Sequence, residues 1–235
     1  SLQTIIGLFK FSRPFNLMKV SCNSVYSLSS LSLKYCLGNE DLDNGHNLEP
    51  IPPERIIVQY SGSMNKKQGF EYLLPVIEHF KNNEKLFWVF GGEGPTKNEL
   101  IKKTKNIKNI KFLPLQESRK MCEWLNSADI HIIPQNQKIE DLVFPSKLLP
   151  ILASGKPIIS NSSKDSELGT IIEKVGIRVN PINHYEFINA LNILIADKSL
   201  GISLGIKARD FVVDKFNKFI VLEKFNDFLE NQLEK

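Results

Sequence analysis

The chain has 235 residues, of which 42% are hydrophobic and 24% are charged, and both values are ordinary for a soluble globular protein. Its 30 basic and 26 acidic residues give a net charge of +4, which suits an anionic ligand and is too small to indicate a nucleic-acid partner. The three cysteines, Cys22, Cys36 and Cys122, show no CxxC spacing. We therefore expect no disulfide framework and no zinc site, and a cytoplasmic location.

The first part of the chain differs in composition from the rest. Residues 1–53 are rich in Ser and Asn and end at Pro50, Pro52 and Pro53, which disfavour both helix and central strand. We predict an irregular or helical N-terminal appendage over residues 1–53, closing in a linker at 40–54, followed by one domain over 54–235.

An apolar segment lies near the start of this appendage. The run from Thr4 to Phe11 is far too short to cross a bilayer. Leu2 to Phe15 nevertheless combines apolar side chains with Lys10 and Arg13, a mixture typical of interfacial helices. We expect this segment to contact either the inner face of the membrane, peripherally, or the last helix of the domain.

From Arg55 onward, short apolar runs alternate with segments of helical periodicity. The predicted strands cover residues 56–60, 86–90, 110–113, 129–133, 157–160 and 177–179. The predicted helices cover about 68–81, 96–105, 118–126, 145–153, 165–174, 184–197, 201–215 and 218–233. This alternation predicts an α/β fold, with helices on both faces of a Rossmann-like parallel sheet. Ligands of such sheets bind beyond the carboxyl ends of the strands, so the loops that follow the first four strands should line the site.

The loop after the first predicted strand carries small and basic residues. Ser61 to Gly69 contains Gly62 and Gly69, which let a backbone approach a ligand closely, together with Lys66 and Lys67. A helix N-terminus after such a loop presents free N–H groups to an anion. An ordinary strand-to-helix turn with two solvated lysines explains the same pattern. The glycine-rich stretch after the second strand, Gly91 to Pro95, likewise fits a nucleotide contact or a tight turn.

A third segment opens the helix predicted at 145–153. Pro145 suits the first helical position, which places Ser146 and Lys147 in the first turn. A lysine there opposes the helix dipole, whose positive end lies at the N-terminus. Because Lys147 breaks this local rule without local compensation, the pattern favours a role in binding an anion.

The histidines offer no alternative chemistry. His46, His79, His131 and His184 show no spacing typical of metal ligands, and we expect no metal site. His131 lies within a predicted strand and is interpreted as a hydrogen-bonded structural residue.

Taken in order, these segments resemble the C-terminal, donor-binding domain of retaining GT-B glycosyltransferases of family 4. They also resemble the bacterial colanic-acid-type fucosyltransferases of exopolysaccharide synthesis. The resemblance covers about three quarters of the chain and rests on Tyr60-Ser61-Gly62, Lys67-Gln68-Gly69, Gly92-Glu93-Gly94-Pro95, Phe112 to Gln116, Ala128-Asp129, Pro145-Ser146-Lys147-Leu148, Ala153 to Ile159 and Glu167-Leu168-Gly169.

The resemblance implies a GDP- or UDP-sugar as donor, with no other cofactor. Its phosphates would lie near the Ser61–Gly69 loop and Lys147, and its base near the backbone of Leu113 to Leu115. We predict Lys147 and Lys67 as catalytic groups. The predicted donor-binding residues are Gly62, Ser63, Lys66, Gln68, Gly92, Leu113, Pro114, Leu115, Phe144, Pro145, Ser146 and Leu148.

Two departures from the family pattern concern the donor site. Many members carry an arginine directly after the first glycine, where this chain has Ser63. Many also carry two glutamates separated by seven residues; the first position falls near Leu142 here, and the second, which contacts the ribose, on Pro150.

The expected function is glycosyl transfer to a saccharide or lipid-linked acceptor in surface polysaccharide synthesis, with a separate acceptor domain or partner chain. One alternative is a non-catalytic nucleotide-sugar-binding subunit or truncated interaction module. Another is an unrelated dinucleotide enzyme of Rossmann type, against which the missing GxGxxG after the first strand argues.

Overall fold

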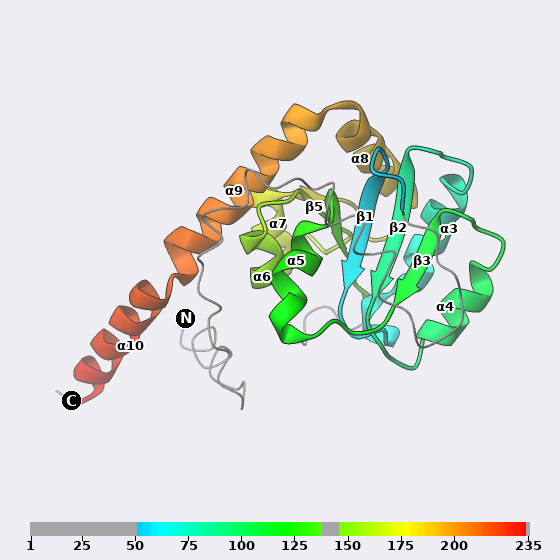
Figure 1. Cartoon of the computed structure of the whole chain (residues 1–235). Coiled ribbons are helices and arrows are strands. Elements are labelled where there is room, and N and C mark those ends of the chain that lie inside the picture. The colour runs from blue at the N-terminus through cyan, green and yellow to red at the C-terminus, as the bar shows by residue number, and fades with distance from the viewer. Residues whose placement is uncertain (1–50, 138–145, 234–235) are drawn as a thin grey trace.

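The computed structural model describes residues 51–137 and 146–233, which form an alternating series of strands and helices (Figure 1). The strands are β1 (Ile56–Ser61), β2 (Leu86–Gly91), β3 (Ile110–Leu113), β4 (Ile130–Ile133), β5 (Ile158–Ser160) and β6 (Ile177–Arg178). The helices are η1 (Lys66–Gln68), α3 (Phe70–His79), α4 (Lys97–Lys103), η2 (Ser118–Lys120), α5 (Met121–Asn126), α6 (Leu148–Ala153), α7 (Glu167–Val175), α8 (His184–Ala196), α9 (Lys198–Phe216) and α10 (Lys218–Leu233). The appendage predicted over 1–53, with the segment Leu2–Phe15, lies outside the described residues except for its last three positions.

The six strands form one sheet in the order β3-β2-β1-β4-β5-β6, and every neighbouring pair is parallel. The predicted Rossmann-like α/β fold is therefore confirmed. β2 and β3 are added on one side of β1, whereas β4, β5 and β6 are added on the other. The direction of strand addition therefore reverses between β1 and β4, which lie side by side. In open parallel sheets, ligands typically bind beyond the carboxyl ends of the strands at such a reversal point, which is here called the crevice position.

Two apolar layers hold the helices to the sheet, because a strand buried on both faces directs alternate side chains to opposite sides. On one face, Val58 and Tyr60 of β1 pack with α3 and α8 through residues such as Leu73 and Phe187. On the other face, Ile57 packs with residues of α5, α6 and α7, such as Leu152. This alternation explains why Tyr60 and Ile57 point to different layers.

The start of the domain lies slightly earlier than the sequence suggests. Ile51, within the predicted linker, is buried in the second apolar layer. The packed domain therefore includes this residue.

The last two helices extend away from the sheet. α9 packs against α6, where Arg209 donates to the carbonyl oxygen of Ala153 at 3.0 Å, and α10 lies beyond its far end (Figure 1). Phe219 on α10 is 79% exposed. No single helix among the described residues is long and apolar enough to span a membrane, although α8 with α9–α10 passes as a sharply bent pair on length and composition alone.

His131 is a structural residue, as interpreted from its position in a strand. It is fully buried in β4, and its Nε2–H donates to the carbonyl oxygen of Leu125 at 3.0 Å. Burial lowers the pKa of His131 to about 4, so the ring is neutral near pH 7.

The loops that follow β1, β2 and β3 are joined by backbone hydrogen bonds. Gly62 N donates to Gly91 O at 2.9 Å, Met64 N to Glu93 O at 2.8 Å, and Gly92 N to Leu113 O at 3.1 Å. At Gly92 the φ angle is 145°, and a Cβ atom would lie 1.9 Å from the carbonyl oxygen of Gly62. Only glycine permits both this conformation and this close approach.

Two glycine-to-alanine substitutions should therefore have opposite effects. Gly92→Ala should destabilise the protein by about 2 kcal/mol or more, because backbone atoms of the neighbouring loop must move. Gly201→Ala, within α9, is the matched control. Its Cβ would make an ordinary 3.6 Å contact with Pro157, and alanine in place of glycine in a helix should stabilise the protein by about 0.5–1 kcal/mol. Urea unfolding measures both. A Gly92→Ala protein as stable as wild type would contradict this account of the loop junction.

Candidate functional site

The loop after β1 lies at the β1–β4 reversal and is held in place by two asparagines, one within the loop and one after β4. Asn65 caps η1, its Oδ1 accepting from Lys67 N at 2.9 Å. Asn136, after β4, donates its N–H to Lys67 O at 3.0 Å and its side-chain amide to Lys66 O at 3.1 Å. The loop is thus fixed to the strand with which β1 forms the crevice.

Gly69 ends η1 in the left-handed conformation, with φ at 59°. A Cβ atom there would lie 2.6 Å from the carbonyl oxygen of Gln135. Gln135 in turn exchanges two hydrogen bonds with the side chain of Asn161, which follows β5, at 2.9 and 3.0 Å. The loops after β1, β4 and β5 are therefore connected by close packing and hydrogen bonds.

Lys147 lies directly before α6, and its amine contacts the end of β1 and the loop that follows it. Its Nζ donates to Gln68 Oε1 at 2.7 Å and to the Tyr60 hydroxyl oxygen at 2.9 Å, and it stands 4.2 Å from the centre of the Tyr60 ring. A Cβ atom on Gly62 would lie 3.3 Å from Lys147 Cδ, so this glycine leaves room for the lysine. The lysine therefore lies against the β1 loop that was predicted to bind phosphate.

Among the described residues, the groups that contact this amine are uncharged. Within residues 51–137 and 146–233, no carboxylate forms an ion pair with Lys147. Burial lowers the pKa of Lys147 to about 7, since desolvation disfavours the charged form and only dipoles and an aromatic face offset it. An anion bound beside the β1 loop would supply an opposite charge that the described residues do not provide.

The basis of the Lys147 prediction needs one correction. We expected Lys147 in the first turn of a helix starting at Pro145, but α6 begins at Leu148 and has six residues, with Lys147 at its N-cap position. The helix dipole at this short element therefore does not explain the lysine. Its hydrogen bonds to Gln68 and Tyr60 do.

Other predicted residues of the β1 loop are exposed. Ser63, Lys66 and Lys67 lie on the surface of the loop, while Gly62 and Gln68 are half-buried beside Lys147. The structure thus brings Gly62, Gln68 and Lys147 into one cluster and leaves two lysines free of burial at its rim.

The predicted base-binding segment follows β3. Leu113 is buried, whereas Pro114 and Leu115 are exposed, with 61% of Leu115 accessible. Gly92 lies at the junction of the β1 and β2 loops, next to Gly62. These residues lie along the same carboxyl edge of the sheet as the Lys147 cluster.

The remaining predicted residues surround Lys147 in the sequence. Ser146 is exposed, but Leu148 is fully buried in the apolar layer beneath the site, so it supports the site and offers no surface to a ligand. Phe144 and Pro145 lie outside the described residues. Among the described residues, no three His, Cys, Asp or Glu side chains form a group that could hold a metal ion.

Sequence reasoning missed the Tyr60 hydroxyl. It donates to the carbonyl oxygen of Ser63 at 2.5 Å and accepts from Lys147, so it connects the loop to the amine. Tyr60 ends a run of apolar strand residues, and this position suggests an ordinary core side chain. A tyrosine directly before a glycine-containing loop was the available signal.

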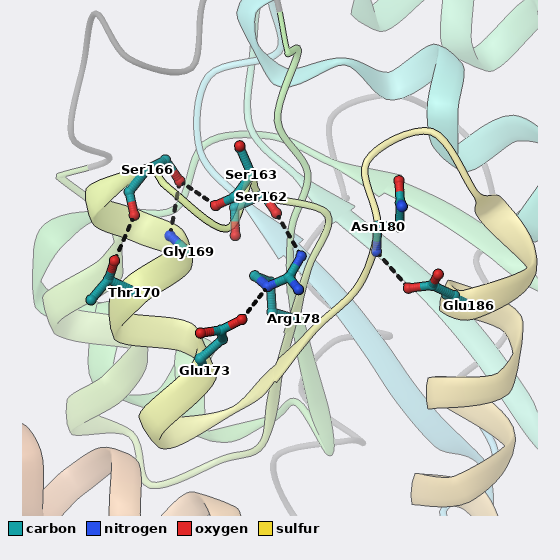
Figure 2. A network of polar contacts seen from close by, with 9 residues as sticks. All are labelled: Ser162, Ser163, Ser166, Gly169, Thr170, Glu173, Arg178, Asn180 and Glu186. Atoms are coloured by element: carbon teal, nitrogen blue, oxygen red, sulfur yellow. Dashed lines mark hydrogen bonds and ion pairs between the residues drawn. The ribbon is translucent and has the colours of Figure 1, made fainter.

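A second polar network lies at the carboxyl ends of β5 and β6. Arg178 lies between Glu173, to which its Nε donates at 2.8 Å, and Ser162, whose carbonyl oxygen its Nη1 reaches at 3.5 Å (Figure 2). Ser166 caps α7 by accepting from Gly169 N at 3.0 Å. These contacts fix the loop that carries Asn161, and so support the crevice from the far side.

The family is decided by a sequence match. Residues 43–211 match the model of the family described as "Glycosyl transferases group 1". The chain belongs to this family. This glycosyl transferase is also 28% identical over 193 residues to WcaI of Escherichia coli (strain K12), named as a colanic acid biosynthesis glycosyl transferase, covering 80% of this chain and 46% of the relative. It is 29% identical over 175 residues to the glycosyltransferase WbjE of Pseudomonas aeruginosa, covering 72% and 42%.

Solved structures show the same fold. The C-terminal domain of the group 1 glycosyl transferase LpcC from Francisella tularensis aligns with a TM-score of 0.57 and 22% identity, covering 70% of this chain and 87% of that one. Anabaena Alr3699/HepE in complex with UDP aligns with a TM-score of 0.65 and 14% identity, covering 76% and 50%. The expected GT-B-type, Rossmann-like domain is therefore confirmed. The chain spans about half the length of the curated relatives it matches.

The buried amine leads to a stability prediction. Above about pH 7 the folded protein has lost the Lys147 proton while the unfolded chain keeps it up to about pH 10.5, so wild-type stability should gain from this group as pH rises between these values. Lys147→Met lacks this gain, which has a slope of at most about 1.4 kcal/mol per pH unit. The variant should be more stable than wild type near pH 7, and this advantage should shrink towards pH 10.

Urea unfolding of wild type and Lys147→Met across this pH range measures the difference. Lys164→Met, which removes an exposed lysine, controls for the loss of one surface charge. Parallel pH profiles for wild type and Lys147→Met would mean that Lys147 keeps an ordinary affinity for its proton.

Proposed function

We propose that this glycosyl transferase is the donor-binding part of a retaining, family 4 enzyme, and that it binds a nucleoside diphosphate-sugar at the carboxyl edge of its sheet. One observation carries the proposal: a buried lysine amine without a carboxylate partner among the described residues lies at the β1–β4 reversal. A diphosphate would supply the negative charge that the described residues do not place at this amine. The solved complexes of HepE with UDP and with UDP-glucose support a nucleotide of this kind.

The proposed reaction needs stabilisation of a leaving group. The bond between the sugar C1 and the diphosphate oxygen breaks, a bond from C1 to an acceptor hydroxyl oxygen forms, and the acceptor proton is released. The diphosphate leaves with the electrons of the broken bond. Lys147 and the exposed Lys67 would stabilise that charge, so the protein contributes mainly positioning and electrostatics, without a metal ion.

The nucleoside would extend along the sheet edge towards β3. Backbone groups of Leu113 to Leu115 are the proposed contacts of the base, since this segment follows β3 at the same edge and is partly exposed. These backbone contacts leave both UDP and GDP as candidate nucleotides, and titration with each of them distinguishes the two.

The acceptor is proposed from the relatives. WcaI is named for colanic acid biosynthesis, which supports a saccharide or lipid-linked acceptor in surface polysaccharide synthesis. The chain covers 46% of that relative, which supports a separate acceptor-binding domain or partner chain. The location proposed for such a synthesis is the cytoplasm or the inner face of the membrane.

A second candidate is a non-catalytic nucleotide-sugar-binding subunit. Pro150 of α6 occupies the position at which many family 4 enzymes carry the ribose-binding glutamate, and it has no polar side chain. Binding without turnover in the presence of an acceptor domain would favour this role.

Calorimetric titration of UDP, GDP and their sugars into the chain tests donor binding. We expect at least one nucleotide to bind, and Lys147→Ala to weaken its binding about ten- to a hundredfold, since a hydrogen bond to a charged group contributes about 1.5–3 kcal/mol. Lys156→Ala serves as control, because Lys156 precedes β5 at the opposite edge of the sheet and should not affect binding. If folded Lys147→Ala binds like wild type, the phosphate role passes to Lys66 or Lys67.

Transfer needs a separate measurement. We expect the chain alone to bind donor but to transfer little or no sugar, and transfer to rise when a chain carrying an acceptor-binding domain is added. Release of nucleotide in the presence of a lipid-linked saccharide acceptor measures this. Robust transfer by the chain alone would contradict the proposed division of labour.

A further inference from the structure

The Tyr60 hydroxyl is held in one place by its surroundings. Tyr60 is fully buried, and its ring packs edge-on against Phe70 at 4.9 Å between centroids and lies 6.0 Å from Phe90. The hydroxyl has two polar partners. It donates to Ser63 O at 2.5 Å and accepts from Lys147 Nζ at 2.9 Å.

Because the hydroxyl uses its only proton on Ser63, it can offer Lys147 nothing but a lone pair. A lone pair stabilises the ammonium form of the lysine, which has three protons to donate. Burial raises the pKa of the Tyr60 hydroxyl further above its usual value, so the hydroxyl stays neutral and acts on Lys147 only as an acceptor.

The charged groups on the elements packed around Lys147 do not replace this contact. Lys66 and Lys67 on the β1 loop carry the same sign as the amine, and both are exposed. Glu93, after β2, is paired with Lys97 at 2.6 Å. The residues of the β4 loop at 134–137 are uncharged. Within the described residues, the Tyr60 hydroxyl and Gln68 Oε1 are therefore the acceptors that stabilise the ammonium form.

We propose that Tyr60 is a positioning residue for the donor: its hydroxyl orients the Lys147 amine beside the β1 loop and stabilises its ammonium form, so that this amine takes up a proton when the donor binds. The inference rests on the proposed binding of a nucleoside diphosphate-sugar. Tyr60 itself contacts no reacting atom; it acts through Lys147. Loss of the hydroxyl should thus weaken donor binding most at a pH where the free amine is largely deprotonated.

Binding of UDP-glucose and GDP-mannose to wild type and Tyr60→Phe at about pH 5.5 and about pH 8 tests this. If loss of the acceptor lowers the pKa of Lys147 by about one unit, Tyr60→Phe should bind about tenfold more weakly at pH 8 and nearly equally at pH 5.5. The phosphates of these sugar nucleotides do not titrate in this range, so the difference reports on the protein.

Tyr72→Phe is the matched control. The Tyr72 hydroxyl lies 2.9 Å from the carbonyl oxygens of Asn180 and Asn183, between α3 and the start of α8. Tyr72→Phe also removes a tyrosine hydroxyl that donates to backbone carbonyl oxygens, but this hydroxyl does not contact Lys147. Donor binding should therefore be unchanged at both pH values. If Tyr60→Phe weakened donor binding equally at both pH values, the hydroxyl would only stabilise the loop structure, and the inference would be overturned.

Two further measurements separate this inference from the proposed function, and the first of them uses the wild-type protein alone. Titration in two buffers of different ionisation enthalpy should show that wild type takes up close to one proton per donor at pH 8. Binding without proton uptake would overturn the inference while leaving the proposed function intact.

The second measurement uses no nucleotide. The pKa of Lys147 can be followed by NMR with ¹³Cε-labelled lysine, assigned through Lys147→Arg, and it should fall in Tyr60→Phe. An unchanged pKa would overturn the inference. Absence of any nucleotide binding by wild type would instead contradict the proposed function.

Discussion

A lysine amine buried among dipoles is the constraint on which the rest of the site depends. An ammonium group removed from water needs either an opposite charge or several well-placed dipoles. Among the described residues, Lys147 has a carbonyl-type oxygen from Gln68, a hydroxyl from Tyr60 and the face of an aromatic ring. Those three groups come from a strand and a loop, so the site exists only when β1, its loop and the start of α6 are assembled.

The sheet provides this assembly because its strand order reverses between β1 and β4. Asn136 then lies close enough to hold the backbone of Lys66 and Lys67, and Asn161 holds Gln135. Side-chain amides supply both a donor and an acceptor, so each can replace the partners that a loop backbone would otherwise lack. The crevice is consequently surrounded by short, well-bonded loops, which favours a site that exists before its ligand arrives.

Membership of the group 1 glycosyl transferases fits this arrangement but does not define the chemistry of the chain. The distinctive features lie in residues that differ from the pattern of the family 4 enzymes that the sequence resembles. Ser63 takes the place of an arginine, and its carbonyl oxygen is bonded to Tyr60, whose hydroxyl also contacts Lys147. A cation that other members carry on the β1 loop is thus absent at that position, while another reaches the same loop from the start of α6.

The sequence by itself determined the order and type of the secondary structure, because short apolar runs and helical periodicity are local properties of a chain. It also indicated the loop at Ser61–Gly69 and Lys147, through small residues and a charge that no local rule explains. Only the tertiary structure decided that Lys147 contacts Gln68, 79 residues earlier in the chain, and that Leu148 faces the core. Periodicity cannot show which side of the sheet each segment reaches, nor that the hydroxyl of an apparently ordinary core tyrosine would meet a lysine 87 residues away. Those contacts follow from the strand order, which is set by the packing of the whole domain.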